Sequence, residues 1–400
     1  MKTVHRTCPA CDSNSVELLY HQEFVLPDES PLSSRYDVVL CQQCGLAFAD
    51  TATSQATYDR FFVVSSIYED TKTSIGLGGT ASDTARLEAT ADTIAEAFGD
   101  KNIRIADIGC GGGGVLAKLK ERGYKNLTGV DPSAACVRHI NENLGIEALQ
   151  GLLGALPLAD RQFDLIILSH VLEHVRSFES IGQLFADNLS EVGRAYLEVP
   201  DSARYADHIA SPFQDFNTEH INHFSFDTLC NLVLKFNLEP QERGEKDILQ
   251  DGGWKYPAFY GIFKQRENTE NMVLTPPDPR FKNSMERYIR ESDKLLDHLE
   301  SQIAPHVEYG QPLIIWGTGQ LTYKLLALTS LKKANIQFFV DSNPVNQGKH
   351  LRQAPILPPA KLTSSETAIL LGTTLHSASI AKTIKEDLGL KNPLIFLSLN

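Results

Sequence analysis

The sequence predicts an α/β protein whose centre is a Rossmann-like fold, and two observations carry that prediction. The β-branched run from Arg104 to Ile108 reads as a buried strand, the glycines 109 and 111–114 allow a sharp turn close to a ligand, and a helical segment follows from Val115. A second strand, Leu127 to Val130, then ends in Asp131. Strand, glycine turn, helix and a strand-end acid are the opening unit of a nucleotide-type fold.

Composition restricts the possible functions. The 400 residues suggest two to four domains, and an apolar fraction of 42% is enough for real cores. A formal net charge of −13 argues against a large nucleic-acid surface. The sequence holds no apolar run of membrane-spanning length, and the N-terminus lacks an apolar signal core. We therefore expect a soluble cytoplasmic protein with neither nucleic acid nor a membrane as partner.

Four of the seven cysteines form two close pairs, Cys8/Cys11 and Cys41/Cys44, and Gly45 allows the tight knuckle after the second pair. Two such pairs supply four thiolates, which is the ligand set of a closed, structural zinc site. Rubredoxin-like iron is chemically possible, and a redox Cys-x-x-Cys is disfavoured because no thioredoxin-like unit surrounds it. An odd cysteine count argues against a disulfide scaffold. The first fifty residues are thus predicted to be a metal-held module.

The glycine turn reads Asp107-x-Gly109-x-Gly111-x-Gly113, with an acid at the end of the first strand. That acid suits a cofactor with an amino-acid tail, and Asp131 suits the ribose hydroxyls of an adenosine group. No Lys-Ser or Lys-Thr follows the glycines, which excludes a P-loop, while an NAD-type turn stays the alternative. This pattern resembles the class I S-adenosylmethionine (SAM) methyltransferases.

The resemblance implies further cofactor contacts. Strand three is expected at Glu147 to Gln150, and the adenine position that follows it, often an acid in relatives, is Leu152 here. Strand four, Phe163 to Ser169, ends at the sheet edge where ligands bind. Topology alone therefore brings four polar residues near the cofactor: Ser169, His170, Glu173 and His174.

Residues 51–80 are polar and aromatic, and a helix with one apolar face is expected over 81–98. In SAM enzymes this helix and the loop before it commonly close over the active site. Tyr68 is therefore interpreted either as a lid residue that reaches substrate or as an aromatic that packs the helix onto the sheet.

The second chemically dense stretch follows strand five, which is expected at Ala195 to Val199. It runs from Asn217 to Ser225 and contains Glu219-His220. These residues are either solvated loop polars or an acid/base pair over the methyl acceptor, because histidine titrates near neutral pH. A helix from Ser225 to about Phe236 comes next. Two closing strands are then expected, Leu238 to Ile248 and Tyr256 to Phe263.

The C-terminal third begins with a proline-rich linker over 265–282 and a long helix to about Ile303, for which Asn283 and Glu286 suggest a capping box. A second α/β unit follows, with a Gly317-Thr-Gly319 turn and Asp341 at a strand end. A substrate-holding or structural role is favoured there over a second nucleotide site. The predicted domains are a zinc-binding module (1–55), a SAM domain with an N-terminal lid (56–265), a linker and long helix (266–310) and a C-terminal Rossmann-like domain (311–400).

Taken together, the chain resembles the sugar C-methyltransferases that act on nucleotide-linked deoxysugars. The four cysteines, the Asp107–Gly113 turn, Glu219-His220 and the Gly317-Thr-Gly319 turn fall in the family's order. The resemblance implies that His220 is the base and Glu219 its orienting partner, with His174 and Tyr68 lining the same pocket. This sequence departs from the family at Asn217, where a tyrosine is usual, and His223 supplies an additional imidazole.

The implied reaction removes a proton beside a sugar carbonyl, stabilises the oxyanion through His174 or Tyr68, and methylates the carbon. One alternative is an O- or N-methyltransferase of the same architecture acting on a sugar or another small precursor. Another is a non-catalytic zinc-module scaffold. The expected ligands are SAM, structural Zn²⁺ and a nucleotide-linked sugar, in a monomer or homodimer.

Overall fold

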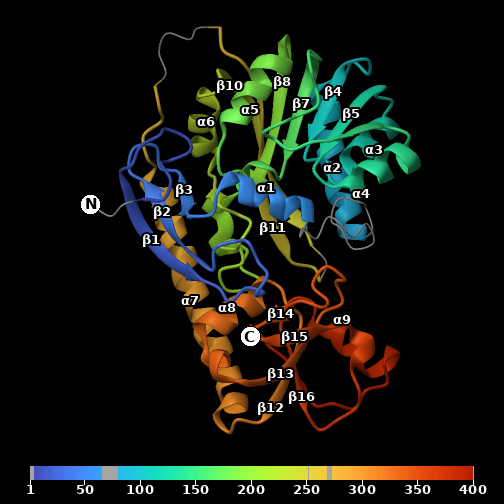
Figure 1. Ribbon diagram of the computed structural model, residues 1–400. Coiled ribbons are helices and arrows are strands. Elements are labelled where there is room, and N and C mark those ends of the chain that lie inside the picture. Colours follow the sequence, from blue (N-terminus) through green and yellow to red (C-terminus); the bar gives the residue numbers. More distant parts are fainter. Residues whose placement is uncertain (1–3, 65–79, 251, 268–272, 400) are drawn as a thin grey trace.

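The computed structural model describes residues 4–64, 80–250, 252–267 and 273–399. It contains three sheets, of four, seven and six strands. In Figure 1 the seven-stranded sheet stands at the top, the blue N-terminal sheet lies beside it, and the red C-terminal unit lies below both. The predicted α/β class is confirmed.

The central sheet has the strand order β10-β11-β8-β7-β4-β5-β6. The five strands from β8 to β6 are parallel, whereas β11 runs antiparallel to both of its neighbours. Its elements are β4 (Arg104–Ile108), α3 (Gly114–Glu121), β5 (Asn126–Asp131), α4 (Ala134–His139), β6 (Glu147–Gln150), β7 (Phe163–Ser169), α5 (Glu179–Asn188), β8 (Leu189–Pro200), α6 (Phe226–Leu234), β10 (Leu238–Leu249) and β11 (Lys255–Gln265).

The order of the strands on the two sides of β4 sets the position of the ligand site. Successive strands β5 and β6 lie on one side of β4, and β7 and β8 lie on the other. Such a reversal leaves a crevice at the carboxyl ends of the central strands. The glycine turn after β4, Asp131 at the end of β5 and Ser169 at the end of β7 all reach this crevice. Strand β8 begins six residues earlier than the predicted Ala195, because Leu189 already pairs with Phe163.

The N-terminal sheet consists of β1 (Val16–Glu23), β2 (Arg35–Cys41), β3 (Ala47–Asp50) and β9 (Asn222–His223), all antiparallel. Strand β9 belongs to the loop that carries His220, so this sheet joins the first fifty residues to the central unit. One apolar core runs from Cys8 and Phe48 into the central sheet. A helix that the sequence did not predict, α1 (Gln55–Val64), follows, with Tyr58 buried on its inner side.

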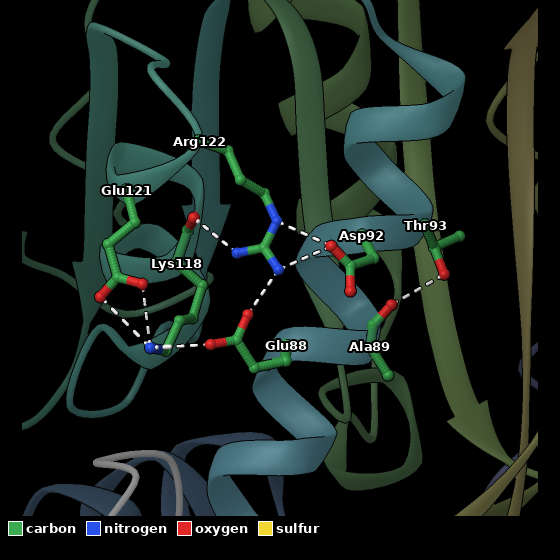
Figure 2. Close-up of polar contacts among 7 residues, drawn as sticks. All are labelled: Glu88, Ala89, Asp92, Thr93, Lys118, Glu121 and Arg122. Carbon is green, nitrogen blue, oxygen red and sulfur yellow. Dashed lines mark hydrogen bonds and ion pairs between the residues drawn. The ribbon is translucent and has the colours of Figure 1, made fainter.

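Helix α2 (Ala81–Ala97) forms where the apolar periodicity predicts it, and Thr80 caps it by accepting a hydrogen bond from the Asp83 N–H at 3.2 Å. Figure 2 shows how α2 is fixed to α3. Arg122 donates to Asp92 at 2.9 Å and to Glu88, and Lys118 pairs with Glu88 at 2.9 Å. Individual exposed pairs contribute little, but this network joins the helix after the glycine turn to the helix that closes the crevice.

The long helix α7 (Pro279–Glu308) starts four residues before the predicted capping box at Asn283 and Glu286. Asp278 caps it instead by accepting from the Arg280 N–H at 2.8 Å, and Pro279 suits the first helical position. The buried face of α7 packs into a core shared with the N-terminal sheet and the C-terminal unit. None of the helices in the described residues combines the length and the apolar character that crossing a membrane requires.

The C-terminal unit is a second, smaller parallel-rich sheet, as predicted, with two additional short strands. Its elements are β12 (Pro312–Trp316), α8 (Gln320–Leu328), β13 (Asn335–Val340), β14 (His350–Leu351), β15 (Ala354–Leu357), β16 (Ala368–Leu371), α9 (Ser377–Lys382) and β17 (Leu394–Ile395). Asp341 closes its own turn, accepting from the backbone N–H groups of Thr318 at 2.9 Å and Asn343 at 2.8 Å. Short helical turns complete the chain at Ile140–Leu144, Leu172–His174, Ser202–Asp207, Ser330–Lys333, Pro359–Lys361 and Thr383–Asp387.

A substitution at Gly113 tests the packing at the start of α3. Its φ is +78°, and a Cβ there would lie 2.7 Å from Ile140 Cγ1. Gly113→Ala should lower the free energy of unfolding by about 2–4 kcal/mol, through backbone strain plus overpacking. The control Gly123→Ala has a φ of +93° but meets nothing within 4 Å among the described residues, so it should lose only about 1–2 kcal/mol. Equal losses in denaturant unfolding would show that Ile140 moves aside without cost.

Candidate active site

A cleft of about 740 Å³ opens at the carboxyl ends of β4, β5 and β7. Its walls come from distant parts of the chain: α1, the start of α2, the 172–174 turn, the loop before β9, the β10–β11 hairpin and the C-terminal unit. Seven of the eight predicted cofactor residues line it, namely Asp107, Gly109, Gly111, Asp131, Leu152, Ser169 and His170. The structure thus brings the predicted cofactor residues together in one place.

Gly113 is the exception. It lies outside the cleft lining in the described part of the chain and forms the N-cap of α3. Its positive φ and its contact with Ile140 explain why the position holds glycine. The third glycine of the motif therefore serves helix packing rather than ligand contact.

The glycine turn holds two acids at the floor of the cleft. Asp131 Oδ2 accepts from the Gly111 N–H at 2.8 Å, and its Oδ1 accepts from the Ser133 N–H at 2.9 Å. Gly109 has a φ of +75°, and a Cβ there would lie 2.7 Å from Val171 Cγ2. Burial, with the charge of Asp131, raises the pKa of Asp107 to about 7. A cationic ligand group beside Asp107 would offset that burial, so the turn fits the charged tail of SAM.

Arg86 and Asp83 also line the cleft, from the first turns of α2. They form an ion pair of 2.8 Å, and Arg86 opposes the burial effect on Asp107. Sequence reasoning missed both because a charged pair three residues apart on a helix ordinarily marks a solvated face. Only the position of α2 over the glycine turn shows that these side chains face a ligand.

His170 occupies the cleft floor with a φ of +55° and belongs to a buried chain of charges. Its Nδ1 lies 3.2 Å from Glu173 Oε1 and its Nε2 lies 3.3 Å from Glu198 Oε1, while Lys246 Nζ lies 2.6 Å from Glu198 Oε2. Burial alone would lower the pKa of His170, but the two carboxylates raise it to about 9. His170 is therefore a cation at neutral pH and balances the acids below the cleft.

His174 and His220 meet on the opposite wall, where their ring centroids are 4.8 Å apart. His174 Nδ1–H donates to the Glu219 carbonyl at 3.1 Å. Burial, followed by the influence of His174, lowers the pKa of His220 to about 3. His220 is thus a neutral imidazole at neutral pH, and it lines the same cleft as the predicted cofactor residues.

The predicted orienting partner of His220, Glu219, lies outside the cleft lining of the described chain. Burial raises the pKa of its carboxyl group, and the carboxylate that acts on His220 is Glu173. Asn217 explains the local geometry, because its Oδ1 accepts from the backbone N–H groups of Glu219 at 2.9 Å and His220 at 2.8 Å. Asn217, predicted near the acceptor, therefore shapes the turn that presents His220.

His223 is fully buried in the described structure, between the rings of Phe216 and Tyr205. Burial lowers its pKa to about 3, and it lies outside the cleft lining. The sequence predicts that His223 supplies an additional imidazole near the acceptor, but β9 turns its side chain into the core instead. Tyr68 lies outside the described residues.

Asp215 is an acid that sequence reasoning missed. It lines the cleft and is 1% exposed, Tyr256 donates to its Oδ1 at 2.7 Å, and its Oδ2 has no partner in the described structure. Burial raises its pKa to about 6. Trp254 and Tyr256 flank this end of the cleft, and Leu375 and His376 close it from the C-terminal unit.

The buried Asn222 side chain joins three parts of the site. Its Nδ2 donates to the carbonyls of Leu172 at 2.8 Å and Val175 at 2.7 Å, and its Oδ1 accepts from Arg6 at 3.0 Å. The Ile221 N–H donates to the Glu173 carbonyl at 2.7 Å. These bonds fix the turn that carries Glu173 and His174 against the loop that carries His220.

The four predicted metal ligands Cys8, Cys11, Cys41 and Cys44 converge as the sequence predicts. Their Sγ atoms all lie within 4.8 Å of one another. The Cys8–Cys44 and Cys11–Cys41 Sγ–Sγ distances are each 3.5 Å. Zn–S bonds of about 2.3 Å place tetrahedral sulfurs ~3.8 Å apart. The cluster is compatible with zinc.

Comparison with known proteins supports the methyltransferase fold. Residues 83–242 match the family described as a methyltransferase domain. A stretch of 259 residues is 25% identical to cyclosporin synthetase of Tolypocladium inflatum and covers 60% of this chain. The chain spans about 2% of the length of that relative.

Among solved structures, the PH0226 protein from Pyrococcus horikoshii OT3 is 17% identical with a TM-score of 0.39, over 49% of this chain and 95% of that chain. Coclaurine N-methyltransferase bound to N-methylheliamine and SAH is 15% identical with a TM-score of 0.37, over 50% of this chain and 77% of that chain. The matched family residues contain the glycine turn, Asp131 and His220, so this part of the chain is similar to a methyltransferase domain.

Asn222→Ala tests the contact between the turn that carries Glu173 and His174 and the loop that carries His220. It leaves two buried carbonyls without donors and should lower the free energy of unfolding by about 2–4 kcal/mol. Asn231→Ala is a matched control, because its buried amide donates to the carbonyls of Cys44 and Thr275 away from the cleft. Both variants should lose stability, but only Asn222→Ala should lower methyl-transfer activity at a temperature where both remain folded. Equal activity losses would count against the role of this contact.

Proposed function

We propose that this enzyme methylates a carbon beside the carbonyl of a nucleotide-linked keto-sugar, with His220 as the base. The observation that carries the proposal is the neutral imidazole of His220 in the same cleft as the glycine turn. A neutral imidazole accepts a proton, and its place across the cleft from Asp107 and Asp131 leaves the acceptor between donor and base.

The donor end of the cleft fits SAM residue by residue. Asp131 stands at the strand end where ribose hydroxyls are accepted, and its carboxylate lines the cleft. Asp107 and Arg86 complement the ammonium and carboxylate groups of an amino-acid tail. When bound, SAM supplies an electrophilic methyl group on a sulfonium centre, to which the acceptor carbon becomes bonded.

At the acceptor end, His220 removes the proton beside the carbonyl and so converts the ketone into an enolate. His174, which is oriented by its bond to the Glu219 carbonyl, stabilises the developing oxyanion. Asp215 Oδ2 is available to accept from a sugar hydroxyl, and Trp254 and Tyr256 offer aromatic faces. Leu375 and His376 lie where an acceptor longer than one ring would extend.

Deuterium exchange separates C-methylation from its alternatives. Incubation with candidate nucleotide-linked keto-sugars in D₂O, without SAM, should place carbon-bound deuterium beside the carbonyl. His220→Ala should lower this exchange about 100-fold or more and retain SAH binding in calorimetry. His298→Ala, which removes an exposed histidine of α7 outside the cleft lining of the described chain, is the control and should retain the exchange.

The other outcomes identify the other functions. Methylation of a hydroxyl or amine without carbon-bound exchange would assign an O- or N-methyltransferase. Calorimetry that detects neither SAM nor SAH would support the scaffold. Lost SAH binding in His220→Ala would place His220 at the donor rather than the acceptor.

We further propose that the four-cysteine cluster holds a structural Zn²⁺. The convergent Sγ atoms support this, as does the closed ligand set with no position left for substrate. The ion would stabilise β1–β3 and, through the β3–β9 pairing, the loop that carries His220.

Cys41→Ser tests the zinc site. Removal of one thiolate should reduce bound zinc from about one ion per chain to well below that value, measured by elemental analysis. Cys230→Ser, a half-buried cysteine outside the cluster, should keep the full zinc content. Full zinc content in Cys41→Ser would overturn the four-thiolate assignment.

A further inference from the structure

Glu173 has an unusual environment for a buried acid. Its side chain is fully buried, its Oε1 contacts His170 Nδ1 at 3.2 Å, and its Oε2 has no partner among the described residues. His220 Nδ1 is likewise buried without a partner there. One carboxylate oxygen of Glu173, one ring nitrogen of His174 and one of His220 all lie within 4.8 Å of one another.

An unpartnered buried acceptor and an unpartnered buried imidazole nitrogen are each costly. The carboxylate of Glu173 and the ring of His220 approach within 4.8 Å, so a small side-chain rotation can bring an acceptor and a donor together. The backbone keeps them together, because the Ile221 N–H is bonded to the Glu173 carbonyl and Asn222 is bonded to the residues on both sides of Glu173 and His174.

The carboxyl group of Glu173 is also favoured in its ionised form, which is the form that accepts a hydrogen bond from an imidazole N–H. Burial opposes its ionisation, but the hydrogen bond from His170 and the nearby imidazoles hold its pKa below the usual range. The predicted partner, Glu219, has the opposite tendency, since burial raises its pKa. The carboxylate whose charge acts on the pKa of His220 is that of Glu173.

We propose that Glu173, rather than Glu219, is the positioning residue of His220. On acceptor binding, the His220 Nδ1–H donates to Glu173 Oε2 and directs Nε2 toward the acceptor carbon. The proton then moves from carbon to Nε2, the C–H electron pair stays with the acceptor as an enolate, and Glu173 remains ionised beside the new imidazolium. This inference rests on the proposed base role of His220.

A divalent cation is the competing occupant, because two histidines and one carboxylate can ligate such an ion. The charge balance disfavours it. His170 and Lys246 already neutralise Glu173 and Glu198, so a dication would lie beside a protonated His170. The pairing with His220 adds no charge before proton transfer.

Glu173→Gln tests the proposal in the deuterium-exchange assay. We expect the exchange rate constant to fall about 100-fold while the KM for the keto-sugar and the SAH affinity stay within about threefold. The acidic limb of the pH–rate profile should shift to lower pH by about one unit or more, because the imidazolium has lost its carboxylate. Glu173→Asp, which keeps the charge, should recover part of the rate without that shift. Glu219→Gln should lose much less than Glu173→Gln.

The outcomes separate this inference from the proposed function. If the wild-type enzyme shows no exchange, the proposed function fails. If the wild type exchanges and Glu173→Gln keeps its rate and pH profile within about threefold, only the role of Glu173 fails. A larger loss in Glu219→Gln than in Glu173→Gln would restore the sequence-based partner.

Two further measurements use the wild-type enzyme, in case Glu173→Gln does not fold. In ¹⁵N-histidine-labelled protein with SAH and the methylated product, a hydrogen-bonded Nδ1–H resonance should appear that is missing in His220→Ala. Its absence would overturn the proposal. Stoichiometric binding of Mn²⁺ in electron paramagnetic resonance, abolished by His220→Ala, would replace the pairing with a metal site.

Discussion

The active site depends on the side-chain amide of Asn222. Two carbonyls of the 172–175 turn and the guanidinium of Arg6 meet on that single group. The turn comes from the central sheet and Arg6 from the N-terminal module, while Asn222 itself follows the loop that carries His220. Because all three partners are buried, none can be satisfied by water if the amide is displaced. The relative placement of Glu173, His174 and His220 is therefore a property of the whole assembly.

Charge balance is the second constraint. Asp107, Asp131 and Asp215 line the cleft, and this acidic lining suits a sulfonium and an ammonium group. Below this layer, His170 and Lys246 neutralise Glu173 and Glu198, so the acids can be buried without a large desolvation cost. Among the described residues, Asp215 Oδ2 is an unpaired acceptor that the cleft can offer to a ligand, while the charged groups beneath it are paired.

Much of this organisation could be predicted from sequence because it follows local rules. The strands β4, β6, β7 and β12 begin and end where the sequence predicts them, and the glycine turn and cysteine pairs are short patterns with strict geometry. The misplaced residues depend on tertiary contacts. Gly113 is explained by its approach to Ile140, and His223 by the rings of Tyr205 and Phe216, contacts that form only when the chain is folded. Asn217 carries the same donors and acceptors in a turn as in a binding site, and only the fold shows which role it has.

The pairing of β3 with β9 also bears on how the chain is made. Strand β3 ends at Asp50, whereas its partner begins at Asn222, after most of the parallel strands. During synthesis from the N-terminus, the cysteine module therefore remains for a time a three-stranded sheet with an exposed edge. Contacts so far apart in sequence close slowly, and an open edge invites pairing with other chains. Early binding of a metal ion by the four thiolates would stabilise the three-stranded sheet, including the exposed edge of β3, until β9 has been synthesised.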